Sequence, residues 1–312
     1  EATRPFDMQV HKYNMSQPDI VGFIESFRDM LNEYPGTFTV AEVGGPNPIG
    51  EMKAFTEGDE RLNSAYNFDF LYAPKLGAER VMRSANLWDQ SDEEGWPSWA
   101  FSNHDAPRAV TRWAPGEQRD EMARLYMLLL LTLRGNPIIY QGEELGLPQA
   151  NVPFSHLKDP EAIMNWPKTL GRDGARTPIP WEAAKPHAGF SSEEPWLPVD
   201  PEHAKLAVDQ QQGNDSMLRF TSEALAVRKR FEALLHGKMT FHETGQDTAL
   251  IVRREASEGG SIALFNFGDT PVAIPSGLVS GGDVVLSSRP LKENLLQDQT
   301  VPARVGVWVR AS

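Results

Sequence analysis

Apolar residues recur over residues 1–146 at spacings that alternate between those of a helix and those of a strand. Residues 19–34 carry apolar side chains every three or four positions, which predicts an amphipathic helix that ends at Pro35-Gly36. The apolar run 38–43 follows directly and predicts a short buried strand that ends near Glu42. The alternation continues, with strands predicted over 65–72, 99–102 and 137–141 and helices over 78–87 and 117–134. Helices that alternate with buried strands are typical of a parallel α/β sheet.

The pattern changes twice after residue 146. Residues 147–212 are rich in Pro, Trp, Asp and Gly with little periodicity, which predicts long ordered loops of the kind that usually carry function. Residues 216–235 are amphipathic again and predict one more helix. Short alternating runs then predict an antiparallel β-sandwich, and they cover 249–253, 261–267, 271–274, 284–286 and 305–309. We therefore expect two domains, residues 1–236 and residues 237–312.

The charge and the cysteine content exclude some classes of binding partner and indicate a cellular compartment. The formal net charge of -13 argues against nucleic acid and anionic membrane surfaces as partners. The chain has no cysteine, which excludes disulfides and thiolate metal sites and fits the cytoplasm, with the periplasm as an alternative. The apolar run 125–133 lies between two arginines and is too short to span a bilayer, so it predicts a buried helix.

Two acidic residues follow predicted strands among residues that favour loops. Glu42 ends the run 38–43, and Asp105 lies in the segment Ser102-Asn103-His104-Asp105 that follows the strand predicted near Trp99. Carboxylates placed just past buried parallel strands are where a β/α barrel keeps its catalytic groups. Paired carboxylates are also what the cleavage of a glycosidic bond requires.

Two of these segments resemble signature regions of a known family. The segments 41–44 (Ala-Glu-Val-Gly) and 101–108 (Phe-Ser-Asn-His-Asp-Ala-Pro-Arg) resemble two of the four signature regions of the α-amylase superfamily, glycoside hydrolase family 13, in its bacterial α-glucosidase branch. The resemblance implies an α/β fold in which residues 1–236 form strands five to eight, the C-terminal half, of a (β/α)8 barrel. It also implies that a small antiparallel β domain follows, because 263–268 (Ala-Leu-Phe-Asn-Phe-Gly) resembles a strand of that domain.

The resemblance assigns roles to individual residues. Glu42 matches the general acid/base, which needs a pKa raised by a crowded, partly apolar pocket; the alternative is a solvated loop glutamate. Asp105 matches the carboxylate that binds sugar hydroxyls and stabilises the transition state, and His104 is expected to bind the same sugar ring. A His-Asp pair is otherwise typical of a helix cap or a pair of metal ligands, but no zinc-like His/Cys spacing accompanies it.

Three arginines and one acidic turn complete the candidate set. Arg172, in 171–181 (Gly-Arg-Asp-Gly-Ala-Arg-Thr-Pro-Ile-Pro-Trp), resembles the arginine that closes the pocket at the non-reducing end of the sugar in α-glucosidases. Arg176 is interpreted as structural, and Arg108 either binds sugar or braces the Asp105 loop. The pair Glu143 and Glu144 is interpreted as an architectural turn that follows the last strand.

The family's aspartate nucleophile lies in a Gly-x-Arg-x-Asp segment on the fourth strand, and no such segment occurs between Glu1 and Glu42. We therefore expect the chain to start after that strand. An N-terminal barrel half that carries the nucleophile is the expected partner, either as a separate chain or as a cleaved part. No cofactor is expected in this chain; the family's calcium sites lie mainly in the early loops, so calcium is expected, if anywhere, in the missing N-terminal part.

The function implied is that of a retaining α-glucosidase, which hydrolyses and transglucosylates short α-glucosides such as maltose or sucrose. Such an enzyme is active only with its first barrel half. One alternative is a non-catalytic amylase-like scaffold, as in the heavy chains of amino-acid transporters, although those relatives lose the catalytic acids. Trehalose synthase, sucrose hydrolase and amylase are alternatives among enzymes of the same superfamily.

Overall fold

The computed structural model describes residues 8–15, 17–44, 47–88, 96–114, 116–169, 171–257, 259–291 and 295–311. The helices are α1 (Ile20–Leu31), α2 (Pro48–Thr56), α3 (Ala78–Asn86), α4 (Ala109–Trp113), α5 (Arg119–Thr132), α6 (Pro160–Asn165), α7 (Pro201–Lys205), α8 (Met217–Arg230), α9 (Glu232–Leu235) and α10 (Leu295–Asp298). The strands are β1 (Val40–Glu42), β2 (Ser64–Asn67), β3 (Pro97–Ala100), β4 (Asn136–Ile138), β5 (Lys238–His242), β6 (Ala249–Ala256), β7 (Gly259–Asn266), β8 (Val272–Ala273), β9 (Asp283–Ser287), β10 (Thr300–Val301) and β11 (Val305–Arg310).

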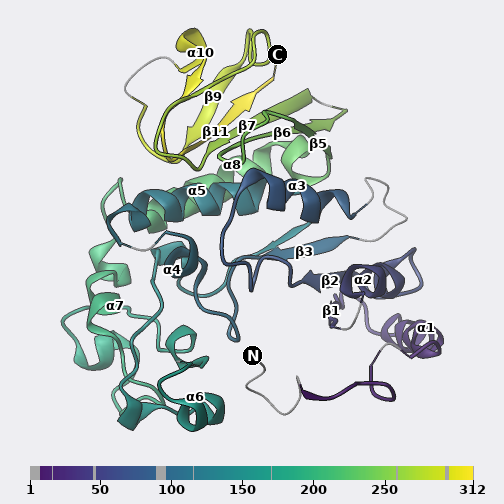
Figure 1. Cartoon of the computed structure of the whole chain (residues 1–312), viewed down its shortest axis with the longest axis vertical. Helices are drawn as coiled ribbons and strands as arrows, with labels where there is room; N and C mark the ends of the chain where they lie inside the picture. Colours follow the sequence, from purple (N-terminus) through teal and green to yellow (C-terminus); the bar gives the residue numbers. More distant parts are fainter. Residues whose placement is uncertain are drawn as a thin grey trace.

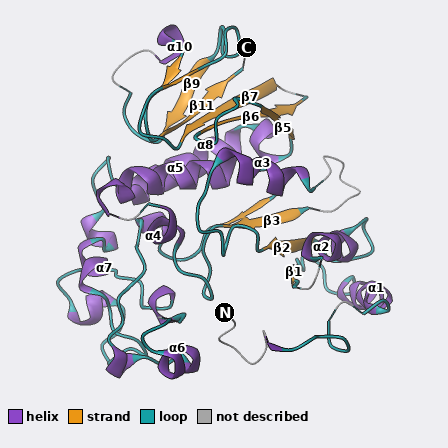
Figure 2. Cartoon of the chain, viewed as in Figure 1, coloured by secondary structure: helices purple, strands orange, loops and turns teal. Residues whose placement is uncertain are grey.

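The first four strands form one parallel sheet in the order β1-β2-β3-β4, as successive strands of a β/α barrel do. Helices separate the strands along the chain, and α3 and α5 lie between this sheet and the second sheet (Figures 1 and 2). The predicted fold class, the second half of a β/α barrel followed by an antiparallel β domain, is confirmed.

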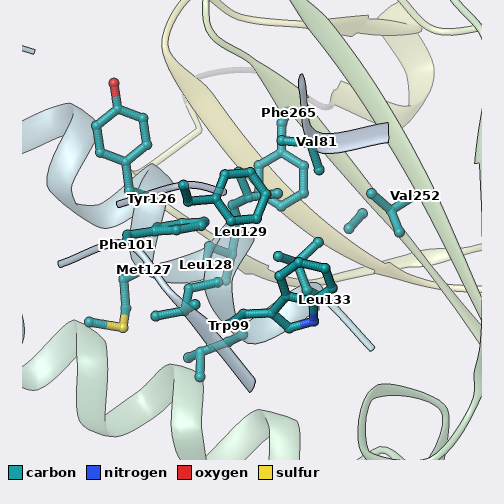
Figure 3. Close-up of a cluster of buried hydrophobic side chains, with 14 of the residues drawn as sticks. Val81, Trp99, Phe101, Tyr126, Met127, Leu128, Leu129, Leu133, Val252 and Phe265 are labelled. Atoms are coloured by element: carbon teal, nitrogen blue, oxygen red, sulfur yellow. The ribbon is translucent and has the colours of Figure 1, made fainter. Parts of the chain in front are cut away.

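The main core lies where α5 packs between the two sheets. Residues 125–133 of α5 and its C-terminal end are buried, as the apolar run predicted. Side chains from both sheets meet this helix in one cluster, among them Trp99 of β3, Val252 of β6 and Phe265 of β7 (Figure 3). Because α5 contributes to both interfaces, the position of the parallel sheet depends on the C-terminal sheet.

The C-terminal sheet is antiparallel, in the order β5-β6-β7-β11-β9, and β8 and β10 form a separate two-stranded sheet. A second apolar cluster, which includes Ile262, Val279 and Val307, lies within this part of the chain. Polar contacts join the sheet to α5: the indole nitrogen of Trp308 donates to the Thr132 hydroxyl at 2.7 Å. Arg254 is fully buried and donates to the carbonyl oxygens of Thr132 and Gly237.

Two predictions about local structure need correction. The strand predicted over 65–72 ends at Asn67, because the Asn67 side chain accepts a hydrogen bond from the Asp69 amide and turns the chain. Phe70 and Leu71 are buried in that turn rather than in a strand. The segment 147–212 is not simply loop, since it contains α6, α7 and several single-turn helices.

The parallel sheet has two edges without a neighbouring strand among the described residues, at β1 and at β4. Large apolar side chains are exposed beside β1: Phe23, Phe27, Met30, Phe38 and Val40. None of the described helices is both long and apolar enough to cross a membrane.

Candidate active site

Glu42 is the last residue of β1 and is exposed. It pairs in register with Tyr66 on β2, so the two residues lie side by side at the carboxyl edge of the sheet. Burial raises the pKa of the Tyr66 hydroxyl, and the negative charges of Glu143 and Glu42 raise it further. The Tyr66 hydroxyl therefore lies within electrostatic reach of both Glu42, at the end of β1, and Glu143, in the turn after β4.

The segment that follows β3 presents His104 and Asp105. The Asn103 side-chain oxygen accepts hydrogen bonds from the amides of Asp105 at 2.9 Å and Ala106 at 2.7 Å, which folds the segment into a tight turn. Asn103 is buried, whereas His104 is exposed and the Asp105 side chain is 32% exposed. The His104 ring nitrogen Nε2 lies 3.6 Å from Asp105 Oδ1.

Two arginines from the segment after α6 converge on Asp105. Arg176 Nη2 donates to Asp105 Oδ1 at 2.6 Å, and its Nε donates to the His104 carbonyl oxygen at 2.7 Å. Arg172 Nη1 lies 3.5 Å from the same Asp105 oxygen. Arg176, interpreted from the sequence as structural, thus also contacts the Asp105 carboxylate directly, which the sequence did not indicate.

Arg172 is held by a partner that the sequence analysis also did not identify. Its Nη2 lies 3.0 Å from Asp159 Oδ1 and its Nε lies 3.1 Å from Asp159 Oδ2, the two-pronged geometry that arginine favours. Burial acts to raise the pKa of Asp159, but hydrogen bonds from Arg172 and the Glu161 amide bring it below its ordinary value. Asp159 also caps α6, so this helix positions Arg172.

Arg108 is buried under the Asp105 loop and does not reach the protein surface. It is 1% exposed, and its guanidinium donates to the carbonyl oxygens of Gln141 at 2.7 Å and Ala175 at 3.4 Å. The guanidinium also lies over the Tyr140 ring, 5.3 Å from its centre. Of the two roles considered for Arg108, these contacts are those of a brace for the loop and not of a sugar ligand.

The turn after β4 holds Glu143 and Glu144. Glu144 accepts a hydrogen bond from the Gly142 amide, and Gly142 has a φ of 89°, a left-handed conformation that favours glycine. Glu143 accepts from the Ser102 hydroxyl and from the Tyr140 amide, so its carboxylate joins β4 to the segment that carries Asp105. This contact between the two segments is not visible in the sequence.

Parallel strands thus bring an exposed carboxyl group, Glu42, to the same edge of the sheet as the Asp105 turn. A carboxyl group of this kind can exchange a proton with a bound substrate, and a carboxylate held in place by arginines can stabilise positive charge. Among the described residues, no group of three or more His, Cys, Asp or Glu side chains is placed to hold a metal ion.

Comparison with known proteins gives consistent matches. Residues 2–237 match the family model of the alpha-amylase catalytic domain. A probable alpha-glucosidase of Rhizobium meliloti (strain 1021) is 39% identical over 271 residues, which are 86% of this chain and 49% of the relative. An oligo-1,6-glucosidase of Bacillus cereus is 29% identical over 73% of this chain and 46% of the relative. The chain therefore spans about half the length of the curated relatives that it matches.

Solved structures show the same fold. The alpha-glucosyl transfer enzyme XgtA superposes with a TM-score of 0.85 at 34% identity, over 99% of this chain and 57% of XgtA. The trehalose-6-phosphate hydrolase of Bacillus licheniformis superposes with a TM-score of 0.82 at 21% identity, over 97% of this chain and 61% of its own, which indicates a shared fold. With its parallel strands, its acidic edge and these matches, the chain belongs to the alpha-amylase catalytic-domain family.

Proposed function

We propose that this chain is the acid/base-carrying half of a retaining α-glucosidase. The observation that carries the proposal is the convergence of Arg172 and Arg176 on Asp105, at the edge of the sheet where Glu42 also lies. The names of the relatives support an α-glucoside as substrate. The non-catalytic alternative is disfavoured because both Glu42 and Asp105 are present.

In the proposed reaction an aspartate of the first barrel half attacks the anomeric carbon of the glucoside. Glu42 gives its proton to the departing glycosidic oxygen as the bond breaks, and a covalent glucosyl intermediate forms. Glu42 then takes a proton from water, whose oxygen attacks the anomeric carbon and releases glucose and the free aspartate. Asp105, held by its two arginines, stabilises the positive charge that develops on the sugar ring in both steps.

The partner in this proposal is a half-barrel of four further parallel strands. Such a half would pair with the free edges of β1 and β4 and cover the exposed apolar side chains beside β1. It would also cover Glu42, which is exposed in this chain. We propose no cofactor for this chain, and the proposed catalysis relies on carboxyl groups alone.

Transfer of glucose to an acceptor alcohol is a second proposed activity. It is favoured by the likeness to XgtA, which is described as an alpha-glucosyl transfer enzyme. The same glucosyl intermediate serves both reactions, because an alcohol can replace water as the attacking group.

The test is to combine this chain with the first barrel half of the Rhizobium meliloti relative and to purify the 1:1 complex. We expect the complex to release glucose from maltose or sucrose, with α-glucose as the first anomer seen by NMR, and to form glucosides when an alcohol is added. A 1:1 complex that hydrolyses no α-glucoside would contradict the proposal. A first product in the β configuration would contradict the retaining mechanism.

A further inference from the structure

Glu143 makes contacts that reach beyond its own turn. Its Oε1 accepts a hydrogen bond from the Ser102 hydroxyl at 2.7 Å, and its Oε2 accepts one from the Tyr140 amide at 2.9 Å. The Ser102 hydroxyl oxygen in turn accepts a hydrogen bond from the Ala109 amide at 2.9 Å. Ser102 and Ala109 stand at the two ends of the loop 103–108, so one hydroxyl group ties both ends of that loop to Glu143.

This loop presents His104 and Asp105, and its inner side is not fully packed. A cavity of about 30 Å³ lies beneath it, bordered by Ser102, Arg108 and Glu143 together with apolar side chains of α5. The side chains that border this cavity lack packing contacts on that side. The hydrogen bonds of Ser102 and Glu143 restrain the base of the loop at this cavity, while Asn103, Arg108 and Arg176 hold the rest of it.

The groups around the Glu143 carboxyl group are hydrogen-bond donors, which suit an ionised carboxylate because it can only accept. Both carboxylate oxygens accept, one from a hydroxyl group and one from a backbone amide. A protonated carboxyl group would have to donate, and the Tyr140 amide offers no acceptor. A protonated Glu143 would donate its hydrogen bond to the Ser102 oxygen. The Ser102 hydroxyl could then no longer donate to Glu143 and would have to rotate away from it.

We propose that ionised Glu143 is a positioning residue, which holds the Asp105 loop in place through the Ser102 hydroxyl. The effect of Glu143 on catalysis rests on the proposed function, whereas its effect on the position of the loop does not. Glu143 itself is not proposed to contact the substrate.

The charge of Glu143 is set by its surroundings. Burial raises the pKa of its carboxyl group to about 7, while Ser102, the Tyr140 amide and the Arg108 charge act to lower it. The titratable groups that face it are Tyr66, Arg108, Arg112, Tyr140 and Glu144. Because the carboxyl group loses its proton as the pH rises through about 7, the restraint on the loop strengthens in that direction.

Hydrogen exchange of the Ala109 amide tests the proposal directly on this chain. We expect its protection factor, corrected for intrinsic exchange, to rise about fivefold between pH 6 and pH 8, which is the worth of one net hydrogen bond. The variant Glu143→Gln, which mimics the protonated form, should show the low value at both pH values. The matched control Glu144→Gln, one residue away, should keep the rise.

Ser102→Ala provides a second variant in case Glu143→Gln does not fold. It removes the acceptor of the Ala109 amide, so protection should be low at both pH values. An unchanged rise with pH in either Glu143→Gln or Ser102→Ala would overturn the proposal, as would the absence of any rise in the unaltered chain.

Kinetics of the assembled barrel give the functional counterpart. We expect Glu143→Gln to lower kcat while KM changes little, and to remove a rise in kcat between pH 6 and pH 8 that Glu144→Gln retains. An equal loss at both pH values would indicate a merely structural role and would contradict the proposal. If the unaltered complex hydrolyses no α-glucoside while the exchange results hold, the proposed function fails and the positioning role stands.

Discussion

Arg176 binds two parts of the Asp105 loop at once. Its Nη2 reaches the carboxylate and its Nε reaches the His104 carbonyl oxygen, from a position 71 residues further along the chain. An arginine can span two acceptors in fixed directions, whereas a lysine is a point charge on a flexible stem. The orientation of Asp105 should therefore depend on the guanidinium group and not on positive charge alone.

We expect Arg176→Lys to lower kcat/KM of the assembled barrel roughly ten- to a hundredfold, since a charge-assisted hydrogen bond contributes about 1.5–3 kcal/mol. Steady-state hydrolysis of maltose measures this loss. Arg253→Lys is the control, because Arg253 forms a half-exposed ion pair with Glu255 on β6, far from the Asp105 loop in the sequence. Equal activity of Arg176→Lys and the control would show that the contact does not orient Asp105.

The candidate carboxylates at the strand ends could be predicted from the sequence, but the side chains that contact them could not. Glu42 and Asp105 could be found because one ends a strand, the other follows one, and each lies in a recognisable segment. Arg176 could not, since it meets a carboxylate 71 residues away, and Asp159 could not, since its pairing with Arg172, 13 residues further on, depends on how the intervening chain folds back. Arg108 was ambiguous for the same reason, and only its burial among carbonyl groups separates bracing from sugar binding.

Among the helices, those with a long apolar pattern were predicted from the sequence, whereas the short capped helices were not. The helices α1, α3 and α5 lie within the predicted spans, because each has a sustained apolar pattern. The helices α2, α6 and α7 were missed, although each begins at an Asx-Pro pair in which the Asn or Asp side chain accepts a backbone hydrogen bond. That pair is itself a start signal, and it outweighed the weak periodicity that follows it.

The junction between α5 and β11 offers a test of how the elements stabilise each other. The fully buried indole of Trp308 packs against α5 and donates to the Thr132 hydroxyl at 2.7 Å. We expect Trp308→Phe to lower the free energy of unfolding by about 2–4 kcal/mol, through the lost hydrogen bond and the space left behind.

Urea unfolding of the chain measures this change, with Thr132→Val as the partner in a double-mutant cycle. The double variant should lose less than the sum of the two single losses, because the hydrogen bond can be removed only once. Strictly additive losses would show that the hydrogen bond between Trp308 and Thr132 contributes nothing.

For the whole molecule, the decisive feature is the open side of the parallel sheet. The edges of β1 and β4 have no neighbouring strand among the described residues, and the apolar side chains Phe23, Phe27 and Met30 of α1 are exposed. Such edges and faces recruit other chains.

We expect the isolated chain to be inactive on α-glucosides and to self-associate as its concentration rises. Addition of the first barrel half should suppress the self-association, because the edges and the apolar face would then be covered. Analytical ultracentrifugation, with and without that half, measures both effects. Sustained glucosidase activity by the chain alone, or a monomer at all concentrations, would contradict this expectation.

The most direct test of the central claim concerns Glu42 as general acid. In the assembled barrel, Glu42→Gln should abolish hydrolysis of maltose, whose leaving group needs a proton, while it retains the first step with α-glucosyl fluoride, whose leaving group does not. The matched control Glu33→Gln, an exposed residue beyond the end of α1, should hydrolyse both substrates normally. Normal maltose hydrolysis by Glu42→Gln, or a first step with α-glucosyl fluoride that is slowed as much as the first step with maltose, would contradict the assignment.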